Sequence, residues 1–121
     1  MKDNKYDLEE RLIDFAIIIS DIVDNLPTTR LGNYIGGQLV RSGCSPALNY
    51  GEAQSAESRN DFIHKMKIIL KELRESLISI KIIDRKSLHD QQKVLKAKDE
   101  CNQLVAIFVK SIETAKKNNL K

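Results

Sequence analysis

Residues 58–83, SRNDFIHKMKIILKELRESLISIKII, contain the pattern that decides the fold. Their apolar side chains recur at spacings of three and four residues, which places them on one face of an α-helix. The members of this stripe are Phe62, Met66, Ile69, Leu70, Leu73, Leu77 and Ile80. Ser58, followed three residues later by Asp61, resembles a capping box and marks the start of the helix. The pattern predicts an amphipathic helix over the whole segment.

Three further segments show the same helical periodicity. Their apolar residues predict helices over residues 7–25, 29–55 and 87–117. Ser87 and Asp90 repeat the capping pattern at the start of the last helix. Pro46 should kink or interrupt the second helix at residues 43–46, because proline lacks a backbone donor and clashes with the preceding turn.

Short connections between the four segments favour helices that run antiparallel to their neighbours. Each helix carries one apolar stripe, and the stripes leave water by packing against one another. A chain of 121 residues without a long linker fits one domain. We therefore predict an all-α, up-and-down antiparallel four-helix bundle with a kinked second helix, in a single domain over residues 1–121.

The composition is that of a folded globular protein. Hydrophobic residues make up 41% of the chain and charged residues 31%, which is too apolar for a disordered segment. The N-terminus, MKDNKYDLEERL, has acidic residues where a signal peptide needs a basic start and an apolar run. The most apolar stretch, residues 12–19, is far shorter than the roughly 20 residues of a membrane-spanning helix. A cytoplasmic protein without a membrane partner is the expectation.

Motifs for catalysis or cofactor binding are missing from the sequence. It has no phosphate-binding loop, dinucleotide fingerprint, nucleophile elbow or zinc-protease motif. Cys44, Cys101, His64 and His89 are scattered and do not form a zinc ligand set. Both cysteines are expected to be reduced, with a disulfide between them as the alternative. We predict a protein that is not an enzyme and that uses no cofactor or metal.

Basic residues are concentrated toward the C-terminus. Residues 1–26 hold three basic and seven acidic side chains, whereas residues 84–121 hold nine basic and five acidic ones. The candidates for phosphate contacts in nucleic acid are Arg85, Lys86, Lys93, Lys96, Lys98 and Lys110. No aromatic residues are interleaved with them to stack on bases. The alternative interpretation is a basic face that only keeps the protein soluble.

Polar residues form a second pattern on the predicted second helix. Arg41, Ser45, Asn49 and Glu52 are spaced four, four and three residues apart and therefore share a face. They form either a surface that contacts a ligand or RNA, or a hydrogen-bond network that positions the helix. On the third helix, opposite charges around Lys65, Glu72 and Glu75 favour a solvated or interface ion-pair face.

Several isoleucines lie away from the main apolar stripes. On a helical wheel they are Ile13 and Ile17 in the first helix, and Ile68, Ile78 and Ile82 in the third. Scattered apolar residues on a surface are normal. A second apolar face is also typical of a subunit interface, and we favour a homo-oligomer.

The run RSGCSPALNYGEAQSAESRNDFIHKMKIILKELRES, residues 41–76, resembles the signature of the 23S rRNA intervening-sequence protein family, also called four helix bundle proteins. The shared residues are Arg41, Ser42, Gly43, Ser45, Asn49, Tyr50, Glu52, Ala53, Ala56, Glu57, Ser58, Arg59, Phe62, Lys65, Lys71, Glu72 and Glu75. Cys44 and Pro46 depart from the pattern, which generally has a threonine and an aliphatic residue there. The opening DLEERLIDFA and closing SIETAKKN also resemble the family.

The resemblance implies a bacterial four-helix bundle that assembles into a homopentamer. Members of the family are often encoded within insertions of large-subunit rRNA genes, and similar bundles assist retroelement reverse transcriptases. Two hypotheses follow from different classes of function. The first is a nucleic-acid-binding module that contacts phosphates through its basic face. The second is a structural adaptor oligomer that docks a protein partner, such as a reverse transcriptase, around Arg41, Asn49, Tyr50 and Glu52.

Overall fold

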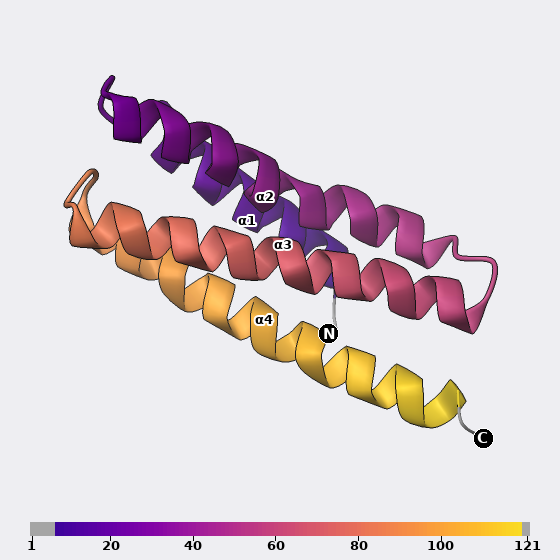
Figure 1. Ribbon diagram of the computed structural model, residues 1–121. Helices are drawn as coiled ribbons and strands as arrows, with labels where there is room; N and C mark the ends of the chain where they lie inside the picture. The colour runs from indigo at the N-terminus through magenta and orange to yellow at the C-terminus, as the bar shows by residue number, and fades with distance from the viewer. Residues whose placement is uncertain (1–6, 120–121) are drawn as a thin grey trace.

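The described part of the chain forms four helices that follow one another in the sequence. The computed structural model describes residues 7–119, in which no strand occurs (Figure 1). The helices are α1 (Leu8–Asp24), α2 (Arg30–Gln54), α3 (Arg59–Arg85) and α4 (Gln91–Asn119). Each helix packs against the next, and α4 also contacts α1. The backbones of the diagonal pairs, α1 with α3 and α2 with α4, stay apart, although the Tyr50 side chain of α2 reaches Phe108 of α4. The predicted all-α architecture of four helices is confirmed, and α1 and α3 occupy opposite corners.

Side-chain caps start all four helices, and those of α1, α2 and α3 follow one pattern. Asp7 accepts a hydrogen bond from the Glu10 amide at 3.3 Å at the start of α1, and Thr29 accepts one from the Gly32 amide at 3.0 Å at the start of α2. Ser58 accepts a bond from the Asp61 amide at 3.0 Å, as the sequence pattern predicted. Each cap satisfies a backbone donor that the first turn leaves without a helical partner.

Helix α4 begins at Gln91, later than the predicted residue 87. Ser87 has a φ of 52° and lies in the turn that ends α3, where the Leu88 amide donates to the Ile83 carbonyl at 3.0 Å. This is a Schellman-type ending, with a serine in the left-handed position that glycine usually takes. The Asp90 carboxylate instead accepts from the Lys93 amide at 3.1 Å and caps the helix. Ser87 therefore ends one helix and does not start the next.

Pro46 lies inside α2, and helical structure runs through residues 43–46 without interruption. An interruption of this helix is therefore a prediction that the structure contradicts. A proline in a helix interior costs about 3 kcal/mol or more. The Pro46 ring is buried in the bundle, and the packing of both sides of α2 holds the helix together across it.

The core consists of apolar side chains from all four helices, with Phe15, Leu39, Leu73 and Phe108 fully buried. On α3 the buried face is rotated away from the predicted stripe. Phe62, Leu70 and Leu77 are only half-buried. The polar side chains Glu72, Ser76 and Ser79 are buried in their place. The reason is that α3 meets α2 through polar contacts, which periodicity in apolar residues does not detect.

Candidate functional site

The outward side of α3 carries a row of positive charges. Residues at spacings of three and four lie on one side of a helix. From residue 67 to residue 85 this side presents Lys67, Lys71, Arg74, Ile78, Lys81 and Arg85. All are exposed except Lys81, which is half-buried. We call the five cations Lys67, Lys71, Arg74, Lys81 and Arg85 the α3 row. It contains no acidic residue and is about 27 Å long at 1.5 Å per residue.

The cations of the α3 row have no carboxylate partner in the part of the chain that the structure describes. The ion pairs there join Arg11 to Glu100, Arg41 to Glu72 and Glu75, and Lys65 to Glu52. A free ammonium or guanidinium group on a surface can bind an external anion without first breaking an internal pair. The row is therefore the feature of this surface best suited to a polyanion.

The six basic residues predicted to contact nucleic acid do not form one patch. Arg85 and Lys86 end α3, and Lys93 and Lys96 line a groove between α1 and α4 that also contains Asp21. Lys98 is half-buried. Lys110 lies 14 residues beyond Lys96, about 21 Å farther along α4, and lines a different cavity.

Sequence reasoning missed four cations of the α3 row. It counted charges by position along the chain, and Lys67, Lys71, Arg74 and Lys81 lie before the C-terminal block. The signal that finds them is the helical period of three and four residues, applied to basic as well as to apolar side chains. Arg85 is the one member of the α3 row that is also among the six basic residues predicted from the sequence.

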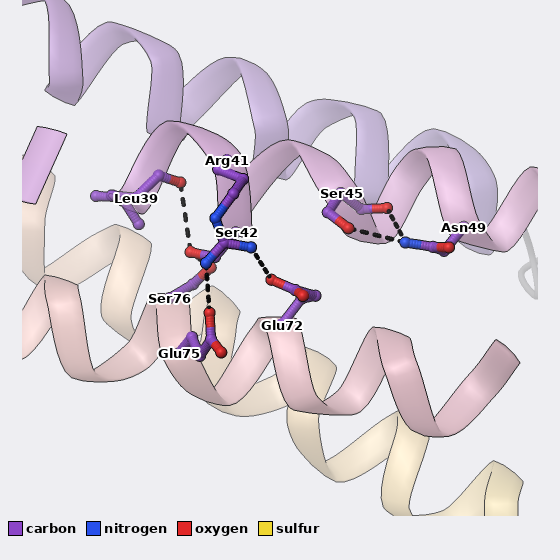
Figure 2. Close-up of polar contacts among 8 residues, drawn as sticks. All are labelled: Leu39, Arg41, Ser42, Ser45, Asn49, Glu72, Glu75 and Ser76. Carbon is purple, nitrogen blue, oxygen red and sulfur yellow. Dashed lines mark hydrogen bonds and ion pairs between the residues drawn. The ribbon is translucent and has the colours of Figure 1, made fainter. Parts of the chain in front are cut away.

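The polar stripe of α2 faces α3 and finds its partners within the chain (Figure 2). Arg41 donates to Glu72 at 2.8 Å and to Glu75 at 2.7 Å, forming a fork across the two helices. The Glu72 side chain is only 10% exposed, and this guanidinium is the cation that pairs with it in the contact between the two helices. The hydrogen bonds to Glu75 and Glu72 raise the pKa of Arg41 above its ordinary value.

Further polar contacts extend this network along α2. The hydroxyls of Ser42 and Ser76 lie 2.8 Å apart in the buried contact between α2 and α3 (Figure 2). Asn49 donates to the hydroxyl of Ser45 at 2.8 Å and to its carbonyl at 3.1 Å. Of the two interpretations of the polar stripe, these hydrogen bonds favour a network that positions the helix.

Near the end of α2, Lys65 donates to Glu52 at 2.8 Å and links this helix to α3 again. That hydrogen bond raises the pKa of Lys65. Glu57 is exposed in the turn that connects the two helices. Polar side chains therefore join α2 to α3 at several positions along the two helices.

Tyr50 and Arg59, which belong to the same signature, lie at the end of the bundle where α2 ends and α3 begins. Both line a cavity of about 350 Å³ that also contains Lys110. The Tyr50 ring packs edge to face on Phe108, with centroids 6.0 Å apart and planes at 90°. Burial, more than the nearby charges of Asp7 and Glu9, raises the pKa of the Tyr50 hydroxyl. The phenol is therefore neutral at physiological pH.

The two cysteines are free thiols. Cys101 is buried and donates to the Leu73 carbonyl at 3.2 Å, and burial raises the pKa of its thiol to about 12. No group of three histidine, cysteine or acidic side chains among residues 7–119 is arranged to hold a metal ion. Nor does that range contain a helix long and apolar enough to cross a membrane.

Exposed apolar side chains gather on α1 and α2. Ile13 is 38% exposed, Ile17 56% and Leu48 71%. The remaining off-stripe isoleucines differ among themselves, since Ile78 is 56% exposed whereas Ile68 and Ile82 are half-buried. Outward side chains around Ile17 include several acids, Glu9, Glu10, Asp14, Asp21 and Asp24. The corner at α1 is thus acidic and apolar, while the opposite corner at α3 is basic.

Comparisons with known proteins agree with this architecture. The profile of a family described as 23S rRNA-intervening sequence protein matches residues 4–110. The chain is also similar to a crystal structure of a protein of unknown function from the S23 ribosomal protein family of Bacteroides thetaiotaomicron. The TM-score is 0.81 at 24% identity, over 88% of this chain and 98% of the other. No curated protein matches the sequence.

Proposed function

The chain belongs to the family of 23S rRNA-intervening sequence proteins, and from this premise we propose that it is a non-enzymatic protein that binds RNA through the α3 row. The observation that carries the proposal is the run of five cations without internal partners on one side of a helix. The name of the family points to rRNA as the kind of partner, and the row supplies the charge that a phosphate backbone attracts.

The spacing of the row suits a backbone contact. Cations three or four residues apart have Cβ atoms about 5–6 Å from each other, and Ile78 separates Arg74 from Lys81 by about 10 Å along the helix. Long lysine and arginine side chains can adjust from there to successive phosphates. The row has no exposed aromatic or amide side chain among its five cations, so it would fix the position of an RNA without reading its sequence.

Salt dependence and charge reversal together test this proposal. Binding of the purified protein to a structured RNA should weaken steeply with salt, with a log–log slope of about −4 if all five cations contact phosphates. Lys71→Glu, Arg74→Glu and Lys81→Glu together should weaken binding about 100-fold and reduce the slope by about three.

The matched control reverses three of the lysines on α4, with Lys93→Glu, Lys96→Glu and Lys98→Glu. Both triple variants change the formal net charge from +3 to −3, because each loses three positive charges and gains three negative ones. A loss confined to the α3 variant supports the α3 row. A loss confined to the α4 variant would move the contact to the C-terminal lysines, and absence of salt-sensitive binding by the unaltered protein would refute RNA binding. Circular dichroism confirms that both variants are folded.

A homo-oligomer is a second proposal, favoured by the exposed apolar side chains of α1 and α2. Ile17 and Leu48 are both more than half exposed, and burying such side chains between subunits is favourable. The resemblance implies five subunits. Light scattering should therefore give about five times the monomer mass of 13.8 kDa, and Ile17→Asp with Leu48→Asp should lower it. A monomer at all concentrations would refute self-association.

A further inference from the structure

The cavity at one end of the bundle lies where α2 ends and α3 begins. Its volume is about 350 Å³, which is within the range of small-ligand sites. All four helices contribute to it, through the first residue of α1, Tyr50 near the end of α2, Phe62 in the first turn of α3, and the C-terminal half of α4. These segments are far apart in the sequence.

One wall of the cavity is aromatic. Tyr50 and Phe62 are both half-buried and pack against the core, so each ring is held in place on one side. The perpendicular contact between Tyr50 and Phe108 further restricts the tyrosine ring. A fixed aromatic ring is a surface on which the flat face of a nucleobase can stack. No aromatic residues are interleaved with the basic ones along the sequence, but folding places two rings from other helices in the cavity that Lys110 lines.

Two cations accompany the rings. Arg59 and Lys110 line the cavity, both are exposed, and no ion pair joins either of them to a carboxylate within residues 7–119. No acidic side chain lines the cavity. The groove between α1 and α4 differs, because Asp21 lines it, and the cavity between α2 and α3 is lined by Glu75. The charges of Asp7 and Glu9 act on Tyr50, so an anionic group is favoured at Arg59 and Lys110 and not beside the tyrosine hydroxyl.

Helix α4 forms the third side and adds hydrogen-bonding groups. Ser111, Thr114 and Asn118 present two hydroxyls and an amide to the cavity. Such groups both donate and accept, so they can pair with the edge of a base or with a ribose hydroxyl. Rings, cations and hydrogen-bonding groups together match the three chemical parts of a nucleotide.

We propose that this cavity binds one unpaired nucleotide of an RNA, with the base stacked against Tyr50 and Phe62 and its phosphate at Arg59 and Lys110. The inference rests on the proposed RNA-binding function and extends it. The α3 row holds the phosphate backbone of the RNA, whereas the cavity binds a base that is not paired in an RNA duplex. The protein therefore prefers RNA with an unpaired end or bulge over a perfect duplex.

Two RNA hairpins test the cavity separately from the α3 row. They share one stem and loop, and one has a 3′ extension of three unpaired uridines while the other has a blunt end. The protein should bind the extended hairpin about tenfold more tightly than the blunt one. Tyr50→Leu should abolish this preference and leave affinity for the blunt hairpin unchanged. Phe62→Leu should reduce the preference, and serves as a second variant if the first one is unfolded.

Fluorescence supplies a readout that keeps Tyr50, Phe62 and both cations of the cavity in place. The chain has three tyrosines and no tryptophan, so Tyr6→Phe with Tyr34→Phe leaves Tyr50 as the single tyrosine. The extended hairpin should quench its emission, and the blunt hairpin should not. Equal affinity for both hairpins, with no difference in quenching, would overturn the cavity proposal while the α3 row still stands. Binding of the extended hairpin alone would support the cavity and refute the row, and binding of neither would refute both.

Discussion

The two sides of α2 are built on different principles. Toward α1, the helix has Gly43 in close contact with Ile19, since a Cβ at this position would lie only 2.7 Å from Cγ2 of Ile19. Toward α3, the same helix has the Ser42–Ser76 hydrogen bond and the fork from Arg41 to Glu72 and Glu75 (Figure 2). One contact depends on shape and the other on polar partners.

This difference changes how the signature of the sequence is understood. Several of its charged residues, Arg41, Glu52, Lys65, Glu72 and Glu75, are bonded to one another across α2 and α3. Side chains held in such pairs are poor candidates for binding an external polyanion, because that would break the internal pairs. The lesson is that a conspicuous polar pattern can mark a contact between helices. The cations on the outward side of α3 are better placed to bind a partner.

The largest effect is expected on the side of α2 that depends on shape. Gly43→Val should destabilise the protein by about 3 kcal/mol, because the added methyl groups meet the branched side chain of Ile19. Gly37→Val is the matched control, since a Cβ there has nothing within 4 Å, and its effect should stay within about 0.5 kcal/mol. Urea unfolding measures both. Equal losses would show that α2 does not rely on close approach to α1.

An intermediate effect is expected at the buried hydroxyl pair. Ser76→Ala should cost about 1–2 kcal/mol, because it removes the 2.8 Å partner of the buried Ser42 hydroxyl and leaves it only the longer 3.5 Å contact with the Leu39 carbonyl. Adding Ser42→Ala should recover most of that loss, since no buried hydroxyl then remains without its partner. Denaturation of the two single variants and the double variant measures this coupling. Strictly additive losses would contradict the hydrogen bond between the two serines.

Smaller losses of stability are expected at the two ion-pair sites, and the more buried site should lose more. Arg41→Met leaves Glu72, whose side chain is 10% exposed, without its cation and should lower the thermal midpoint. Lys65→Met affects a pair whose glutamate, Glu52, is 60% exposed, and should leave the midpoint unchanged. Thermal melts at neutral pH compare them. A larger loss for Lys65→Met would mean that burial does not set the importance of these pairs.

Sequence patterns predicted the four helices and the Ser58 cap, because apolar periodicity and capping residues act locally. They could not predict the buried face of α3, where Glu72 and Ser76 are covered only because α2 supplies partners for them. The cavity shared by Tyr50, Arg59 and Lys110 was equally hidden, since its walls come from separate helices. The α3 row could have been predicted from the sequence, because helical spacing alone aligns its five cations.

Lysine footprinting tests the central claim, RNA binding by the α3 row, most directly. The protein is acetylated with and without a saturating structured RNA, and each lysine is quantified by mass spectrometry. We expect RNA to protect Lys67, Lys71 and Lys81 at low salt, to leave Lys116 and Lys117 unchanged, and to lose its effect at high salt. Full reactivity of the three α3 lysines in the presence of bound RNA, with protection at Lys93 and Lys96, would contradict the account.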